Sequence, residues 1–116
     1  MKFDPELMRS ILLDAEEIPA GEAVGGFEYE DRNQAEVNRH TQILIDEEFL
    51  EGQWQGDEQN FPCGFHVTDL TYRGHQFLAN AKVDSLWNKA LTTIKGSGKS
   101  MSIAVIEAVL VKLATG

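Results

Sequence analysis

The sequence predicts an α+β fold in a single domain spanning residues 1–116, and three observations lead to this prediction. Apolar residues recur every three to four positions in five segments, which indicates amphipathic helices. In residues 50–67, residues suited to the core alternate with polar residues on both sides of a polar turn, which indicates a β-hairpin. A chain of 116 residues suits one hydrophobic core, because two cores of half this size would each bury too little surface.

The first helix is expected to begin after Asp4 and to end near Glu17. Asp4 can accept hydrogen bonds from the first turn, and Pro5 fits the first helical position because its missing N–H is harmless there. The inward stripe consists of Leu7, Met8, Ile11, Leu12 and Ala15. The proline and glycines that follow predict a loop, which we expect to end in a short strand at residues 27–29.

A second helix is expected to begin after Asp31 or Asn33, since either residue can cap it. Its inward sector consists of Val37, His40, Thr41, Leu44 and Glu48, and its opposite side of Arg39, Gln42 and Asp46. In the hairpin that follows, the inward positions are Leu50, Gly52 and Trp54 on one strand and Phe65 and Val67 on the other. Residues 55–60 form the polar turn between these strands.

Three more helices are expected after the hairpin. Thr71 can cap the first, in which Gly74 lowers the intrinsic helix stability by about 1 kcal/mol relative to alanine. Asp84 can cap the second, and Ser100 or Ser102 can cap the last. The inward positions of the three helices are Phe77, Leu78 and Ala81, then Leu86, Trp87, Ala90, Leu91 and Ile94, then Met101, Ile103, Ile106, Val109, Leu110 and Leu113.

Two stretches resemble the recognition-helix and post-wing signatures of small bacterial winged-helix regulators. They are His40-Thr41-Gln42-Ile43-Leu44-Ile45-Asp46-Glu47-Glu48-Phe49-Leu50-Glu51-Gly52 and Leu70-Thr71-Tyr72-Arg73-Gly74-His75-Gln76-Phe77-Leu78. The chain is most similar to an uncharacterised bacterial and phage-associated family, a domain of unknown function. The resemblance implies a winged helix-turn-helix-like domain at residues 1–82 with a two-stranded wing, and additional C-terminal helices at 84–114. The usual glycine at the end of the recognition helix is replaced by Glu48 or Phe49, so we expect that turn to be closed differently.

The net charge and the cysteine content limit the functions and the cellular compartments that the sequence favours. The formal net charge of -9 repels polyphosphate, so non-specific binding of nucleic acid is expected to be weak. The single cysteine, Cys63, excludes an intrachain disulfide and favours a reducing compartment. The N-terminal residues lack the apolar stretch of a secretory signal, and no segment approaches 18 uninterrupted apolar residues. We therefore expect a cytoplasmic protein that does not enter a membrane.

No residue pattern indicates an enzyme, a metal site or a cofactor. The segment 96–100, Gly-Ser-Gly-Lys-Ser, is similar to a phosphate-binding loop, but Thr93 occupies the position of the loop's first glycine, and a helix precedes it where a strand is required. Cys63 and His66 are three residues apart on a strand, which points them to opposite faces and away from a shared metal ion. Cys63 also has no cationic neighbour in sequence to activate it as a nucleophile.

Two functional hypotheses remain open. DNA binding by a transcriptional regulator is favoured by Arg32, Asn38, Arg39 and Gln42 on the outward side of the second helix, because these side chains can bond base edges. DNA is disfavoured by the net charge and by an acidic turn in the hairpin, since phosphate contacts supply much of DNA affinity. The alternative is an acidic protein-interaction adaptor that presents the same helix or the hairpin, with Trp54 and Phe61, to a protein partner.

The last helix predicts self-association. Of the 14 residues from Met101 to Ala114, 11 are apolar, which is more than one core-facing stripe requires. If one side packs on the first helix, valines at 105, 109 or 111 would remain outside, and we place a homodimer interface at Val105 and Val109. The alternative is that the helix is wholly buried in its own domain beneath Trp87 and Leu91.

Overall fold

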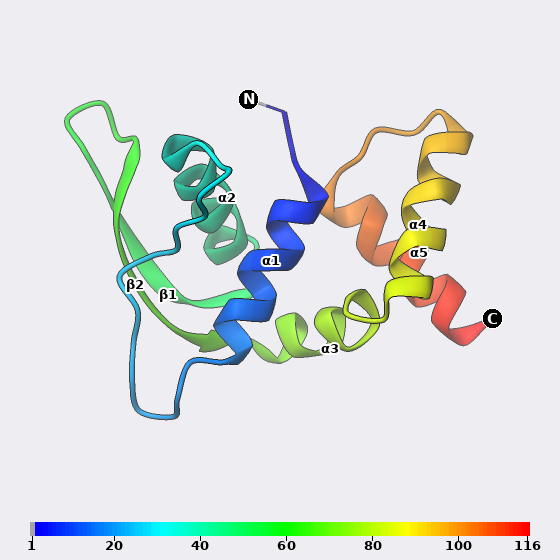
Figure 1. Cartoon of the computed structure of the whole chain (residues 1–116), viewed down its shortest axis with the longest axis horizontal. Helices are drawn as coiled ribbons and strands as arrows, with labels where there is room; N and C mark the ends of the chain where they lie inside the picture. The colour runs from blue at the N-terminus through cyan, green and yellow to red at the C-terminus, as the bar shows by residue number, and fades with distance from the viewer. Residues whose placement is uncertain (1) are drawn as a thin grey trace.

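The computed structural model describes residues 2–116 and has an α+β architecture. Within these residues five helices and a two-stranded antiparallel sheet follow one another as α1 (Pro5–Glu16), α2 (Gln34–Asp46), β1 (Leu50–Gly56), β2 (Pro62–Leu70), α3 (Tyr72–Ala81), α4 (Asp84–Ser97) and α5 (Ile103–Thr115). The sheet and α2 occupy one end of the long axis and α4 and α5 the other, with α1 and α3 between them (Figure 1). Over residues 2–116, no helix combines the length and apolar character that crossing a membrane would require.

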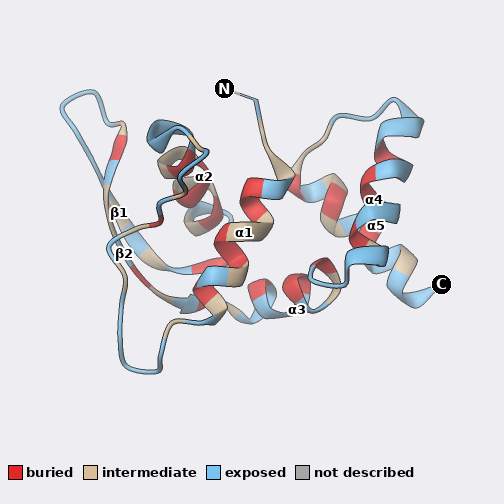
Figure 2. Cartoon of the chain, in the orientation of Figure 1, coloured by how far each residue is buried: buried red, intermediate tan, exposed pale blue. Residues whose placement is uncertain are grey.

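One hydrophobic core runs through the molecule, and the buried residues face inward from every helix (Figure 2). All five positions expected to form the inward stripe of α1 are buried. The largest fully buried side chain belongs to Trp87 of α4, which is 1% exposed. Its indole Nε1 donates a hydrogen bond of 2.7 Å to Glu6 Oε1, which satisfies the buried polar atom and links α4 to α1.

Side-chain caps fix the beginnings of four helices. Asp4, Asn33, Thr71 and Ser102 each accept a hydrogen bond from a backbone N–H in the first turn of the helix that follows. The expectation that Asp84 caps α4 is wrong, because Asp84 is already helical and Val83 occupies the cap position without a side-chain acceptor. The carboxylate of Asp84 still lies in the first turn, where the helix dipole favours a negative charge.

The long connection between α1 and α2 contains no strand at residues 27–29, contrary to expectation. Its contact with the sheet lies earlier, where Val24 forms an isolated antiparallel bridge to Val67 of β2. The Val24 N–H donates to the Val67 carbonyl at 2.9 Å, and the Val67 N–H donates to the Val24 carbonyl at 3.0 Å. Phe27 is buried in the core, so its apolar character reflects packing and not strand pairing.

The turn from α2 into β1 is closed by a residue in the left-handed conformation. Glu48 has a φ of 63°, which lets the Phe49 N–H donate to the Leu44 carbonyl at 2.9 Å. A non-glycine residue in this region costs about 1–2 kcal/mol. The same conformation places Glu48 outside α2 and exposed to solvent, so the expectation that it belongs to the inward sector of the helix is wrong.

The hairpin has the parity expected from the sequence and two irregularities that were not expected. Leu50 pairs with Leu70, Glu51 with Asp69 and Trp54 with Phe65. Register shifts leave Thr68 and Cys63 without a direct partner on β1. Such bulges bend a ribbon and increase its twist.

Helix α5 packs mainly against α4 and α3 rather than against the first helix. Ile103, Ile106 and Leu110 provide its buried side. Of the three valines expected on its outer side, Val105 and Val109 are partly buried against the core, whereas Val111 is 51% exposed. The predicted interface residues Val105 and Val109 therefore lie at the margin of the core, and the outer surface of α5 is formed by other residues, among them Val111.

We expect Gly74→Ala to destabilise the protein by about 1–3 kcal/mol, although alanine is the better helix former by about 1 kcal/mol. A β-carbon on Gly74 would lie 2.1 Å from the carbonyl oxygen of Phe49, so α3 would have to move away from the end of α2. Urea denaturation measures the free energy of unfolding. The matched control is Gly96→Ala in α4, where a β-carbon has no atom within 4 Å and stability should stay equal or rise. Equal stability of the two variants would contradict the proposed contact.

Candidate functional site

The outward face of α2 meets the hairpin through the side chains that the sequence singled out. The Asn38 amide donates to the Pro62 carbonyl at 3.3 Å, and the Arg39 guanidinium lies 4.8 Å above the ring of Phe61. Trp54 donates from Nε1 to Asp46 Oδ1 at 3.0 Å. The structure thus brings Asn38, Arg39 and Trp54 together in one contact between the helix and the hairpin.

Gln42 completes this contact through a chain of hydrogen bonds. Arg39 Nη1 donates to Gln42 Oε1 at 2.6 Å, and Gln42 Nε2 donates to Asp46 Oδ2 at 3.2 Å. Because Asp46 also accepts from Trp54, its two carboxylate oxygens receive one neutral donor each. The polar groups that could bond base edges are therefore already engaged with one another, and a ligand would have to replace these bonds.

Arg32 does not join this group. It pairs with the carboxylate of Asp4, the residue that caps α1. The backbone N–H of Asp4 in turn donates to His40 Nε2 at 2.9 Å, while His40 Nδ1 lies 2.8 Å from the carbonyl oxygen of Glu36. Since an N–H can only donate and a carbonyl can only accept, this geometry requires the neutral imidazole with its proton on Nδ1. The buried His40 and the Arg32 pair together hold the start of α1 against α2.

The charge of Arg32 affects the titration of Asp4. Partial burial alone would raise the pKa of the Asp4 carboxyl, but the hydrogen bond and charge of Arg32 and the N–H groups of Leu7 and Glu6 outweigh it. The pKa of Asp4 therefore lies below its ordinary value. A lowered folded-state pKa means that the ionised carboxylate stabilises the folded protein.

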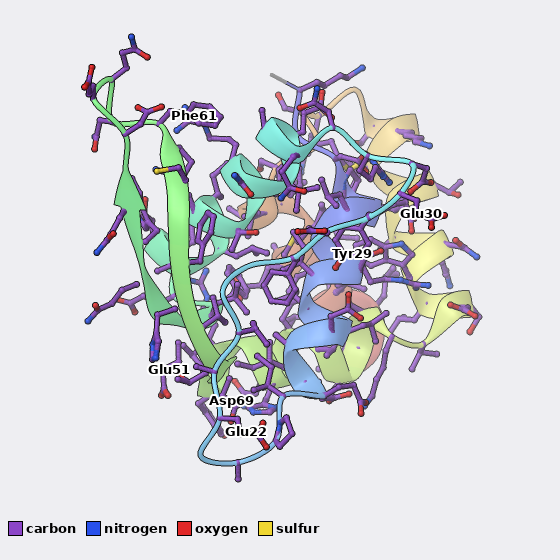
Figure 3. All side chains as sticks on the ribbon, turned by 60° about the vertical axis from the view of Figure 1, so that its left-hand side comes forward. Glu22, Tyr29, Glu30, Glu51, Phe61 and Asp69 are labelled. Carbon is purple, nitrogen blue, oxygen red and sulfur yellow. The ribbon has the colours of Figure 1, made fainter. Side chains whose placement is uncertain are left out.

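A second group of polar residues lies at the base of the hairpin, near α1. Glu22 from the α1–α2 connection, Glu51 from β1 and Asp69 from β2 gather at this end of the sheet (Figure 3). They line a surface groove together with residues 20–23, His66 and Thr68, which we call the acidic groove. Glu51 and Asp69 are direct partners across the two strands, so two like charges face each other in the register.

The acidic groove contains no lysine or arginine. Among residues 2–116, neither Glu22 nor Glu51 forms an ion pair, and the only side chain of this kind near Asp69 is that of the neighbouring His75, whose Nε2 lies 3.4 Å from Asp69 Oδ1 and which pairs with it only when protonated. The hydroxyl of Thr68 donates to Glu51 Oε1 at 2.7 Å. This hydrogen bond orients one carboxylate but supplies no positive charge.

Sequence analysis did not identify the acidic groove, because its three carboxylates are far apart along the chain. One signal was available. Once Leu50 is paired with Leu70, the register of the hairpin puts Glu51 opposite Asp69, and a like-charge pair at that position is unfavourable for a purely structural sheet. The place of Glu22 depends on the Val24 bridge, for which no local pattern exists.

The residues considered for chemistry do not converge. Within residues 2–116, no group of three or more histidine, cysteine, aspartate and glutamate side chains is arranged to hold a metal ion. Cys63 and His66 are both exposed on β2. The segment 96–100 joins α4 to α5, with Gly98 in the left-handed conformation that ends a helix (φ 76°), and a helix precedes it where a phosphate-binding loop would have a strand.

Comparison with known proteins identifies one family. Residues 2–101 match the family described as "Hypothetical protein (DUF2513)", which covers most of the chain, from two residues before the cap of α1 to the residue before the cap of α5. No curated protein and no solved structure matches the chain.

The Asp4–Arg32 pair makes a prediction about pH. Asp4→Asn should lower the free energy of unfolding at neutral pH, because asparagine keeps the helix cap but removes the charge that Arg32 pairs with. The folded pKa of Asp4 lies below its unfolded value of about 3.9, so the contribution is present above that pH and is lost as pH falls further. Urea denaturation of both proteins at pH 7 and near pH 3 tests this. A difference that stays constant across this range would show that the charge has no part in it.

Proposed function

We propose that this chain, which belongs to the DUF2513 family of hypothetical proteins, is a non-catalytic winged-helix-like adaptor that binds a basic segment of a partner protein in its acidic groove. The observation that carries the proposal is the cross-strand pair of Glu51 and Asp69, with Glu22 beside them and no lysine or arginine in the groove. Like charges at directly opposed strand positions reduce stability. Binding a cationic side chain would turn this repulsion into attraction.

The winged-helix-like assignment is supported by the order of the elements. Helix α2 is followed directly by the antiparallel hairpin β1–β2, in the relation of a recognition helix to a two-stranded wing. In this arrangement Asn38, Arg39 and Gln42 lie on the outward face of the helix and Trp54 on the wing. Residues 84–116 then extend the domain with α4 and α5.

The distribution of charge supports a basic protein partner over DNA. Residues 1–83 contain 17 carboxylates and six lysines and arginines, and β1 and β2 contain no lysine or arginine. The only cation on α2 is Arg39, whose guanidinium is held against Phe61 and Gln42. A surface of this kind repels a phosphate backbone and attracts lysine- or arginine-rich segments.

A labelled oligoarginine peptide should bind the protein at low salt, and the double variant Glu22→Gln/Glu51→Gln should weaken that binding about three- to tenfold. The reason is the loss of two of the three groove carboxylates. Fluorescence anisotropy gives the dissociation constant, and raising the salt from about 50 to about 500 mM should weaken binding, since it screens the charges.

The matched control is Glu28→Gln/Glu30→Gln, which removes the same net charge from exposed positions that do not line the groove. Figure 3 shows Glu30 well away from Glu22, Glu51 and Asp69. This control should bind nearly as well as the original protein. If both double variants lose affinity equally, the attraction is a general effect of net charge and the acidic groove is not the site.

The second candidate function is sequence-specific DNA binding. It is favoured by one observation, that Asn38, Arg39 and Gln42 share the outward face of α2 and each remain partly exposed. If the helix reads DNA, Arg39→Ala should cost about 1–3 kcal/mol on a specific duplex. Selection from random duplexes at low salt supplies that duplex. Failure to enrich any sequence rejects this candidate, whereas an enriched site that depends on Arg39 replaces the adaptor proposal.

A further inference from the structure

The surface shared by α3 and α5 differs from the rest of the molecule in shape and in polarity. A groove runs between the two helices, with Phe77 and Leu110 on its floor and Gln76 and Val111 at its sides. Phe77 and Leu110 are buried members of the core, so the groove opens directly onto apolar side chains. We call this groove and its two rims the α3–α5 face.

Large apolar side chains stand at the rims of the groove. Among residues 2–116, the exposed large hydrophobic residues are Tyr72 (79%), Val111 (51%) and Val83 (47%). Val111 lines the groove itself. Tyr72 lies at the start of α3, where its hydroxyl accepts a hydrogen bond of 3.0 Å from Gln76, which lines the groove on the opposite side from α5. Two of the three exposed residues thus flank one apolar depression.

The two helices of the α3–α5 face carry little negative charge of their own, although Glu47 and Glu48 at the end of α2 and Asp69 on β2 lie near its Tyr72 end. Helix α3 contains no aspartate or glutamate, and the only carboxylate of α5 belongs to Glu107. Arg73 neutralises it with two parallel hydrogen bonds of 2.7 and 2.9 Å. The whole chain has 19 carboxylates and a net charge of -9, so the α5 side of this face is where two copies can approach with less repulsion than over the acidic sheet.

We propose that two copies of this chain pair about a two-fold axis through the α3–α5 face. A two-fold contact uses the same patch on both partners, so it requires a raised part and a hollow side by side. Val111 and Tyr72 provide the raised part, and the groove over Phe77 and Leu110 provides the hollow. Helix α5 lies at the other end of the molecule from the sheet, whereas Tyr72 follows the groove residue Asp69 by three positions, so only the α3 edge of the pairing face lies near the acidic groove (Figure 1). This inference does not depend on the proposed partner of that groove.

Sedimentation equilibrium at micromolar concentrations tests the proposal. The original protein should show a mass that rises with concentration toward twice the monomer mass of 12.9 kDa. Val111→Glu should raise the dissociation constant of the pair at least about tenfold, because each copy would bury a carboxylate in an apolar contact. The matched control is Val83→Glu, a valine of similar exposure outside the groove, which should pair like the original protein.

Salt and a second variant separate this contact from others. Because the contact is apolar and the net charge opposes it, high salt should strengthen pairing, whereas it weakens binding in the acidic groove. Tyr72→Glu, at an exposed position, should weaken pairing as Val111→Glu does, and thermal melting confirms that each variant is folded. A mass of 12.9 kDa at every concentration, as expected if another protein or nothing covers the face, would overturn the proposal. Pairing that survives both variants, or that Val83→Glu disrupts equally, would also overturn it.

Discussion

The arrangement of the helices around the hairpin depends on the packing of Phe49. Its ring is completely buried, meets the ring of Phe77 edge-on at 5.3 Å, and is covered by the Arg73 guanidinium at 4.4 Å. Its carbonyl accepts the Thr71 N–H at 3.1 Å and lies against Gly74. One residue therefore fixes the end of α2, the start of β1 and the start of α3. Through Arg73, which also pairs with Glu107, the same junction reaches α5.

Elements with local signals were predicted well from the sequence. The cap, the proline and the buried stripe of α1 follow from short-range geometry, and so does the parity of the hairpin strands. Features that depend on distant residues were not predicted. The Val24 bridge replaces the strand expected at residues 27–29, because which residue of the loop reaches β2 is decided by the packing of the loop. Asp84 carried the right side chain for a cap, yet the helix begins one residue earlier.

The candidate site shows the same difference between features with local sequence signals and features that depend on distant residues. Periodicity placed Arg39, Gln42 and Asp46 together on the outward side of α2, but it could not show that the hairpin tip would cover Arg39 with Phe61.

The uneven distribution of charge along the chain becomes an uneven distribution over the folded molecule. Residues 84–116 contain four lysines and two carboxylates, and both carboxylates are paired with arginines of the preceding residues. The molecule therefore carries its unpaired acidic charge mainly toward the sheet and its free lysines toward α4 and α5 (Figure 1).

The isolated bridge between Val24 and Val67 has a consequence for the entropy of the connection between α1 and α2. A flexible segment loses conformational freedom when its ends are held, and a fixed point within it divides one long loop into two shorter ones. Glu22 lies two residues from that fixed point, within the shorter arm that leads from α1. Much of the cost of ordering the backbone at Glu22 is therefore met when the protein folds. A ligand that contacts Glu22 meets a backbone that is already held in place, and the part of the ordering penalty that comes from the loop backbone is correspondingly small.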